Sequence, residues 1–462
     1  MTVFTRRAVA MTGAAAAVSL TLTACGSGGG SGSDTDSLVI SANAIAGGKN
    51  EQEAKWIEEW VIPNFVDQKK EQDDVDVSVS FDASGVDDEQ YKTKLALDLQ
   101  GGSGPDIMTL DGIWIGEFAQ AGYIKPLTEV VTQADFWEGW DQIPEAVQKL
   151  GSFENERYGI PAGTDGRVLY YNKDLFEQAG LDREWQPAGW DELVEAAEAL
   201  GGIDGVTPVQ LNAGTAMGEA TTMQGFLPLL AGAGEHIWDK GKWRGESDAV
   251  TETLGLYEKI FADGLGDPLL QQEAQGRDKS FEQFADGRIG ILLEGDYFWR
   301  SVVHPELGIA PMEDRDEVVG YAKIPAIEPG KGIHGQDFAS MSGGSARVVN
   351  PETDNPELAF ELLTFMNSDE ALKALLEGEA RITARTDTNA DVLKDDPMLT
   401  FVADEVLPIT AYRPGLAEYT RVSTLLQEAT ASVVSGSSAE DVAASYREKL
   451  EGVVGGAGNI SN

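Results

Sequence analysis

The sequence predicts an α/β fold on three observations. A short apolar run over residues 38–40 and an alternating apolar and polar stretch over residues 75–81 are typical of strands. A stretch with helical spacing of apolar residues, 51–67, lies between them, and strands separated by helices imply a sheet with crossover connections. At 462 residues, the chain is long enough for two or three domains, each with its own core.

The elements expected next carry readable boundaries. Trp56, Ile57 and Trp60 share one face of the predicted helix 51–67, so this face should pack on the sheet. A further strand is expected over residues 106–110, and acidic Asp111 follows it directly. The loop after such a strand lies at the edge where α/β proteins bind ligands.

Later helices are predicted from their caps. A helix from Asp174 should end at Gly180, and another should begin at Trp190 behind a weak glycine cap. Residues 355–357, Asn-Pro-Glu, supply an N-cap, a proline at the first helical position and an acid in the first turn. Gly378 is expected to end the next helix. These elements build the core and carry no chemistry by themselves.

The composition excludes several classes of function. Lys and Arg number 34 against 78 Asp and Glu, a net charge of −44, which argues against nucleic-acid binding and against adhesion of the folded surface to anionic lipid. One cysteine allows neither an internal disulfide nor a Cys-rich zinc site, and three scattered histidines provide no helix-borne metal motif. The sequence therefore predicts no metal and no cofactor.

The N-terminal residues form a targeting segment. Arg6 and Arg7 precede an apolar run of small residues, so residues 1–24 are predicted to be a signal peptide, exported by the general or the twin-arginine route. The motif Leu-Thr-Ala-Cys ending at Cys25 resembles the lipobox of bacterial lipoproteins, in which this cysteine carries two acyl chains. The Gly- and Ser-rich residues after Cys25 complete a flexible tether over 25–37.

Motifs of active sites are absent. The chain contains no phosphate-binding P-loop, no dinucleotide fingerprint and no Gly-x-Ser-x-Gly elbow. Acid-rich stretches at 73–76 and 87–89 lack the spacing of a calcium loop and are interpreted as solvated surface. Because the chain has 78 acids, some pair of carboxylates will fall at a distance suited to glycoside hydrolysis, so this alternative stays open.

Four segments carry a resemblance to a known family. They comprise 104–127, with DGIWIGEFAQAGYIKPL; 158–181, with YGIPAGTDGRVLYYNKDLFEQAGL; 281–299, with FEQFADGRIGILLEGDYFW; and 343–371, with GGSARVVNPETDNPELAFELLTFMNSDEA. In this order and spacing, the chain resembles the extracellular solute-binding proteins of ABC importers, in the maltose and trehalose-maltose cluster. The resemblance covers nearly the whole chain after the signal segment.

The resemblance implies a two-lobed fold of the periplasmic-binding-protein type, with strands crossing a hinge and ligand held between the lobes. On this reading, residues 38–163 and 346–385 form the first lobe. Residues 164–345 and 386–450 form the second lobe, and residues 451–462 form a C-terminal tail. Lobe closure is then a hinge motion that ligand stabilises by contacting both sides.

The residues expected to bind a sugar in the first lobe follow its strands. A saccharide presents hydroxyls on its rim and C–H patches on its faces, so its site needs aromatic surface together with fixed donors and acceptors. Asp111 matches the first-lobe acid of the family, although it also suits a helix cap. Trp114 matches the neighbouring aromatic, with packing as the alternative. Asn43, after the first strand, resembles a polar ligand contact or is a turn residue.

The crossings between lobes supply the next candidates. Asp165 matches the carboxylate that the maltose binders place at the first crossing, and Arg167 is expected at least to balance its charge. Gly343 and Gly344 begin the second crossing, where glycine permits close approach of the backbone to a ligand or simply a bend.

The second lobe is expected to offer an aromatic platform. Glu294, Asp296, Tyr297 and Trp299 occupy the segment where the family places it, but this chain lacks the usual Asn-Trp or Gly-Pro-Trp. Tyr297 and Trp299 are therefore both candidates for stacking on the ligand, with packing in the core as the alternative.

One arginine is also expected near the ligand. Arg385 falls where the trehalose-maltose binders have an arginine directed toward it. The usual proline-bearing turn before it is missing, so Arg381 is a rival. Tyr412 and Tyr419 lie near a further aromatic of the family.

The function that these residues predict is a lipid-anchored monomeric receptor at the outer face of the cytoplasmic membrane. It would capture a di- or oligosaccharide, deliver it to the permease subunits of an ABC importer and catalyse nothing. A polyamine receptor of the same fold is the alternative, since it would use a surplus of acids in the cleft. A secreted carbohydrate-cleaving enzyme is the rival from another class.

Overall fold

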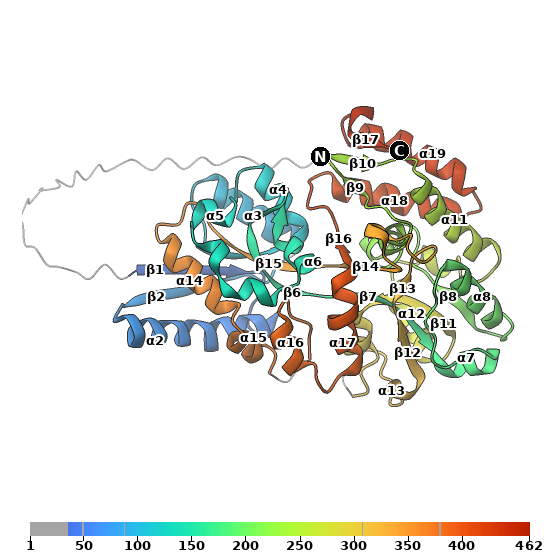
Figure 1. Ribbon diagram of the computed structural model, residues 1–462, viewed down its shortest axis with the longest axis horizontal. Helices are drawn as coiled ribbons and strands as arrows, with labels where there is room; N and C mark the ends of the chain where they lie inside the picture. The colour runs from blue at the N-terminus through green and yellow to red at the C-terminus, as the bar shows by residue number, and fades with distance from the viewer. Residues whose placement is uncertain (1–35, 49, 87, 307, 378–379) are drawn as a thin grey trace, which may run out of the picture. The chain divides into compact units, whose positions relative to one another are not determined.

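Two mixed sheets organise the computed structural model, which describes residues 36–48, 50–86, 88–306, 308–377 and 380–462. The first sheet has the strand order β2-β1-β3-β15-β6 and the second the order β12-β7-β11-β8. We call the parts built on them the first and the second lobe (Figure 1). The predicted α/β class is confirmed. The signal segment, Cys25 and most of the tether lie outside the described residues.

The strands of the two main sheets are short. In the first sheet they are β1 Asp36–Ala42, β2 Val77–Ala83, β3 Ile107–Asp111, β6 Gly159–Thr164 and β15 Gly344–Val349. In the second sheet they are β7 Arg167–Asn172, β8 Thr207–Gln210, β11 Ile289–Gly295 and β12 Val319–Ala322. Three small sheets contain β4 Ser152–Phe153, β5 Glu156–Arg157, β9 Trp238–Asp239, β10 Lys242–Arg244, β13 Ile324–Pro325, β14 Phe338–Ser342, β16 Thr410–Tyr412 and β17 Ile460–Ser461.

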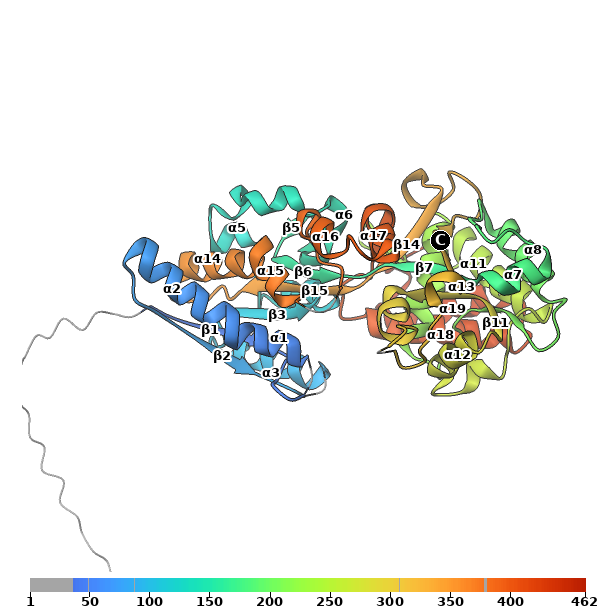
Figure 2. The same cartoon turned by 90° about the horizontal axis from the view of Figure 1, so that it is seen from below.

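Helices connect and cover the strands. Those up to residue 200 are α1 Glu51–Lys55, α2 Ile62–Asp73, α3 Asp88–Gln100, α4 Ile115–Gln120, α5 Leu127–Val130, α6 Glu145–Gln148, α7 Lys173–Ala179 and α8 Trp190–Leu200. Those beyond it are α9 Glu219–Thr221, α10 Leu227–Gly232, α11 Asp248–Ala262, α12 Gly276–Ala285, α13 Arg315–Val318, α14 Pro356–Met366, α15 Asp369–Leu375, α16 Thr386–Val392, α17 Pro397–Phe401, α18 Tyr419–Val434 and α19 Ala439–Val453. Figure 2 shows α14 and α15 beside the sheet of β1, β3 and β15. Within the described ranges, no helix combines the length and apolarity that crossing a bilayer would need.

Several local predictions meet their counterparts in the structure. The expected helix 51–67 is longer, because α1 and α2 join through the π-helical turn Trp56–Val61. Helix α7 ends at Gly180 in the left-handed conformation, as predicted, and α8 begins at Trp190 behind Gly189. Helix α14 begins after Asn355, but the Asn355 side chain makes no capping hydrogen bond. Gly378 lies outside the described residues.

Two strand connections pass from one lobe to the other. Strand β6 of the first sheet continues into β7 of the second through Asp165 and Gly166, and β14 continues into β15 through Gly343. Strand β14 pairs with β13 and β16. The two crossings can be followed in Figure 1 between the groups of elements around β15 and β7. The predicted two-lobed fold with hinge-crossing strands is therefore present. Residues 451–462, expected as a tail, include β17, which pairs in parallel with β10.

Strand pairing brings the functional segments to one edge of the first sheet. Strands β2 and β3 run parallel to β1, whereas β15 runs antiparallel to β3 and β6. In this register Ser345 faces Asp111, and Gly344 faces Thr164. The carboxyl ends of β1, β3 and β6 therefore meet the amino end of β15, which is where ligands bind in α/β sheets.

Candidate functional site

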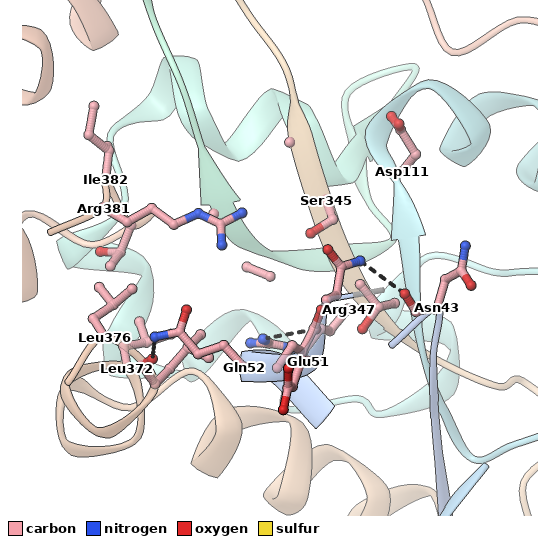
Figure 3. A pocket seen from close by; sticks show the side chains of 18 of the residues that line it. Asn43, Glu51, Gln52, Asp111, Ser345, Arg347, Leu372, Leu376, Arg381 and Ile382 are labelled. Carbon is pink, nitrogen blue, oxygen red and sulfur yellow. Dashed lines mark hydrogen bonds and ion pairs between the residues drawn. The ribbon is translucent and has the colours of Figure 1, made fainter. Parts of the chain in front are cut away.

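A cavity of about 490 Å³ lies along that edge of the first sheet. It falls within the size range of small-molecule sites. Figure 3 shows side chains from the end of β1, from α1, from β15 and from the segment after α15 around it. Its principal lining residues are Asn43, Glu51, Gln52, Glu53, Asp88, Tyr91, Thr109, Asp111, Trp114, Gly163, Gly344, Ser345, Arg347, Leu372, Leu376, Arg381 and Ile382.

Asn43 is held at the wall of this cavity by its amide nitrogen. Its Nδ2 donates to the backbone oxygen of Val86 at 3.1 Å and to Oδ1 of Asp88 at 2.8 Å. The Oδ1 atom of Asn43 is buried and has no hydrogen-bond partner within the described part of the chain. The same holds for Oγ1 of Thr109 and Nε of Arg347, which also line the cavity. Buried polar atoms are rarely left unpaired, and these three are enclosed behind the wall, so a ligand would pair with them only after their side chains turn toward the cavity.

Arg347 supports the floor of the cavity from the middle of β15. It is 1% exposed, and its guanidinium donates to Oδ1 of Asn367 at 3.0 Å and lies 3.8 Å from Oε1 of Glu53. It also stands 4.8 Å over the Trp56 ring. Burial lowers the pKa of Arg347, against the opposing pull of Glu53. Sequence reasoning missed this residue, although a charged side chain inside the apolar strand Ala-Arg-Val-Val was the available signal.

Two aromatic rings form another part of the wall. Trp114 and Tyr91 are 5% and 1% exposed, and their ring centroids lie 6.4 Å apart at an angle of 44°. The Tyr91 hydroxyl is within 3.2 Å of Oγ of Ser41, which fixes the ring. Trp114 thus packs in the core of the first lobe and also lines the cavity, so both readings of it are compatible with its position.

Asp111 combines two tasks at the end of β3. Its Oδ1 accepts from the backbone N–H of Ile113 at 3.1 Å and so caps the short 3-10 helix Gly112–Trp114. The same carboxylate lines the cavity and lies 3.9 Å from Nη2 of Arg413. Enclosure raises the pKa of Asp111, although Arg413 and the Ile113 N–H pull it down. The sequence offered capping and binding as alternatives, and this geometry accommodates both.

A smaller cavity of about 110 Å³ adjoins the larger one at the crossing. The two share Gly163, Gly344, Ser345 and Arg381 in their walls. The smaller one adds Thr164, Asp165, Asp296 and Arg300. The two cavities are therefore neighbours, and the smaller one is lined by residues of both lobes.

Asp165 is fixed at the crossing by several donors. Its Oδ1 accepts from the backbone N–H of Gly343 at 2.6 Å and is also paired with Nη1 of Arg167. Arg167 in turn donates from Nε to Gln224 at 2.8 Å. Burial acts to raise the pKa of Asp165, but Arg167 and the Gly343 N–H outweigh it and hold the pKa below its usual value. Asp165 is thus an ionised acceptor, and Arg167 is the residue that balances it.

Asp296 lines the same small cavity and has longer hydrogen bonds than Asp165. It is 2% exposed, and its carboxylate accepts from the Gly166 N–H at 3.3 Å and from Nε of Arg300 at 3.4 Å. Burial and the neighbouring Asp165 raise the pKa of Asp296 to about 6. Two carboxylates with opposite pKa shifts therefore stand at the crossing.

The two glycines of the second crossing have distinct roles. Gly343 donates its N–H to Asp165 and accepts at its carbonyl from Oγ1 of Thr164 at 3.1 Å. Gly344 has φ = 136°, and a Cβ atom there would lie 2.1 Å from the carbonyl oxygen of Gly163. Only glycine fits at position 344, because the antiparallel backbones approach so closely. Gly344 lines both cavities, whereas Gly343 lies in a smaller depression beside Asp111.

Other predicted residues lie away from these two cavities. Glu294 is fully buried in β11, where Arg277 donates to its carboxylate at 2.7 Å and 3.0 Å. Trp299 is 3% exposed; its Nε1 donates to Asp396 at 3.0 Å, and the Arg315 guanidinium stands 3.7 Å from its ring centre. Burial raises the pKa of Glu294, against the pull of Arg277.

Tyr297 and Arg385 also have partners of their own. The Tyr297 ring is half-buried and has the guanidinium groups of Arg277 and Arg300 5.9 Å and 5.6 Å from its centre. Arg385 is 9% exposed and donates to Asp387, from Nε at 2.9 Å and from Nη2 at 2.5 Å. Of these two candidate arginines, Arg381 is the one that lines the cavities.

A cluster around Arg413 was missed by sequence reasoning. Arg413 follows β16 and donates from Nη1 to Oε1 of Glu219 at 3.2 Å, while its Nη2 approaches Asp111 of the other lobe. Glu219 also accepts from the hydroxyls of Tyr419 and Ser423, both at 2.5 Å. The acids and hydroxyls of this cluster are far apart in sequence, so no local pattern could group them. Among the described residues, no group of three or more His, Cys, Asp or Glu side chains could hold a metal ion.

The fold and the site define a class of protein: two lobes joined by crossing strands, with a polar cavity whose walls come from both. The chain belongs to the bacterial extracellular solute-binding protein family, whose model matches residues 48–373. It is similar to a maltooligosaccharide ABC transporter solute-binding lipoprotein of Streptococcus pneumoniae strain R6, with 23% identity over 342 residues, 71% of each chain.

Solved structures agree with this assignment at the level of the fold. The sugar-binding protein MalE of Xanthomonas citri superposes with a TM-score of 0.70 at 17% identity, over 90% of this chain and 97% of that one. The cyclic alpha-maltosyl-1,6-maltose binding protein of Arthrobacter globiformis superposes with a TM-score of 0.68 at 19% identity, over 91% and 99%.

Proposed function

We propose that this chain is the solute receptor of an ABC importer, that it binds a neutral di- or oligosaccharide outside the membrane, and that it delivers the sugar to the permease by lobe closure. Membership of the family supports the receptor role, and the relative from Streptococcus pneumoniae is named for a maltooligosaccharide. Ligand contacts are assigned to Asn43, Asp111, Trp114, Asp165, Asp296 and Gly344. Glu294, Tyr297, Trp299, Gly343 and Arg385 are assigned a supporting role.

One observation carries the choice of a neutral polyol. Among the described residues, no partner is found for an acceptor of Asn43, a donor of Arg347 or the hydroxyl of Thr109, all beside two aromatic rings. A sugar hydroxyl both donates and accepts, so a saccharide can pair with all three kinds of group once these enclosed side chains turn toward the cavity. A polyamine only donates and would leave the Arg347 N–H unpaired, which is costly in a buried site.

The charges around the cavity also disfavour a cationic ligand. Glu51 is paired with Lys55 at 2.5 Å, Glu53 lies 3.8 Å from Arg347, and Asp111 lies 3.9 Å from Arg413. Three of the acids of the wall therefore already have cations beside them. The overall charge of −44 does not translate into a strongly acidic cleft.

The deciding experiment is isothermal titration of the purified receptor with neutral di- to tetrasaccharides, with uronic-acid oligosaccharides and with spermidine. We expect micromolar or tighter binding of a neutral saccharide and little dependence on salt. Binding of spermidine that weakens steeply with salt, without binding of any saccharide, would overturn the assignment. Prolonged incubation with the bound sugar should yield no cleavage product, which separates a receptor from a hydrolase.

The proposal includes anchoring at Cys25 and a monomeric receptor. Two acyl chains suffice for stable membrane attachment, whereas one is marginal. Replacing Cys25 with serine should release the chain into the medium with its sugar affinity unchanged. Retention of the variant at the membrane would contradict the anchor.

A further inference from the structure

Arg381 is an exposed cation in the wall of the site, and the described residues supply no partner for it. It follows α15 in the first lobe and lines both the 490 Å³ and the 110 Å³ cavity. Figure 3 shows its guanidinium extending from the chain into the space between Gln52 and Ser345. Within the described part of the chain, Arg381 makes no hydrogen bond or ion pair, whereas Arg385, four residues on, is fully engaged with Asp387.

Asp296 is the complementary group on the second lobe. It is almost fully buried at the end of β11, and both of its donors, Gly166 N–H and Arg300 Nε, are at 3.3 Å or more. The nearby Arg167 donates to Asp165 instead. The ion pair of Asp296 with Arg300 is long, at 3.4 Å, so a second guanidinium that approaches this buried carboxylate would stabilise its charge further.

We propose that Arg381 pairs with Asp296 when the lobes close over a ligand, and that this cross-lobe pair holds the closed state. Both side chains already form walls of the same 110 Å³ cavity, so a modest hinge motion can bring them together. The pair is absent when the lobes are open, and its energy therefore adds to ligand affinity rather than to the stability of the free receptor. This inference rests on the proposed function, since it assumes closure around the solute of the same site.

Arg381 is thus a positioning residue that acts through closure, distinct from the ligand contacts of the first-lobe wall. The pair also limits the size of the ligand in the small cavity, because a ligand group that reaches Asp165 must leave room for the Arg381 side chain beside Asp296.

The test is a double-mutant cycle on the ligand affinity of the intact receptor. Arg381→Gln should weaken binding about tenfold and Asp296→Asn at least tenfold, since Asp296 is also a ligand contact. The double variant should bind no more weakly than Asp296→Asn alone, because that change already removes the pair. Arg288→Gln is the matched control, since the Arg288 side chain pairs with the exposed Asp286 at 2.8 Å and lines neither cavity. Losses that multiply to about a hundredfold, or single variants that bind normally, would overturn the proposal.

A second measurement does not depend on identifying the sugar. In a Cys25→Ser background, Arg381→Cys with Asp296→Cys should be joined by a short bismaleimide, because both positions line the small cavity. Lys373→Cys with Asp296→Cys should not be joined, because Lys373 lines neither cavity. Equal cross-linking of the two cysteine pairs, or of neither, would overturn the proposed contact between Arg381 and Asp296. A chain that cross-links as expected but binds no saccharide would refute the proposed function alone.

Discussion

The wall of the first-lobe cavity and the segment at the end of β11 differ in how completely their polar groups are paired. Asn43 and Arg347 line the cavity, and each has a buried polar atom for which the described residues supply no partner. The sequence also suggested Glu294 and Trp299 as ligand contacts. Their polar atoms are already hydrogen-bonded, Glu294 to Arg277 and Trp299 to Asp396. A side chain whose hydrogen bonds are already satisfied supports the scaffold, and one with unused capacity is available to a ligand. The predictions below test that distinction.

The largest effect is expected from breaking the Arg277–Glu294 pair. Arg277→Ala leaves a fully buried carboxylate without its cation, which should lower the free energy of unfolding by about 3–5 kcal/mol. Urea unfolding measures the loss. Replacing both residues, Arg277→Met with Glu294→Leu, should recover most of it, because no charge is then left unpaired.

Sugar affinity of the folded Arg277→Ala protein should stay within about twofold of the parent. If affinity falls tenfold while stability is unchanged, Glu294 belongs to the site and the distinction drawn above is wrong.

The next largest effect is a pH dependence of stability that comes from Asp296. Its folded-state pKa of about 6 exceeds the ordinary value of 3.8, so the folded protein binds more protons than the unfolded chain between these values. Stability should therefore fall as pH rises from about 4 to about 6 and level off above that window. Asp296→Asn should remove this component and be more stable than the parent at pH 7, by up to about 3 kcal/mol.

The measurement is the difference in unfolding free energy between parent and Asp296→Asn across pH 4–7. Comparing the two proteins cancels other groups, including Asp111 and Glu294, whose pKa values are also raised. Asp165 has the opposite sign, since its lowered pKa gives stability that is lost only as pH falls below its ordinary value. A difference that does not change with pH would show that Asp296 titrates normally.

Asp165→Ala should weaken sugar binding by at least tenfold, or about 1.4 kcal/mol. The carboxylate is held ionised by Arg167 and by the Gly343 N–H, and it lines the small cavity. Asp165→Asn keeps an oxygen for the Gly343 N–H and separates loss of charge from loss of the hinge contact. Calorimetry measures the sugar affinity of both variants, and circular dichroism confirms that they fold. Unchanged affinity would remove Asp165 from the site.

The sequence predicted those features that depend on local pattern. Asp111 could be placed because it follows a recognisable strand, and Gly344 because a glycine pair at a crossing permits close approach of two backbones. Arg413 and Glu219 could not be placed, since they come together only through packing of segments nearly two hundred residues apart. Trp299 and Arg385 were plausible by resemblance, but whether a side chain faces a cavity or a buried partner depends on long-range contacts such as that of Trp299 with Asp396.

The smallest and most discriminating prediction contrasts two tryptophans. Trp299→Phe keeps the ring in the core but loses the hydrogen bond to Asp396, a charged acceptor that also caps α17, so stability should fall by about 1–2 kcal/mol with sugar affinity unchanged. Trp114→Phe replaces the indole with a smaller ring and so reduces the aromatic surface that lines the cavity, which should weaken sugar binding several-fold. Thermal unfolding and calorimetry on both variants provide the comparison. If Trp299→Phe is the one that loses affinity, the end of β11 supplies the stacking platform after all, and complete pairing does not exclude a side chain from the site.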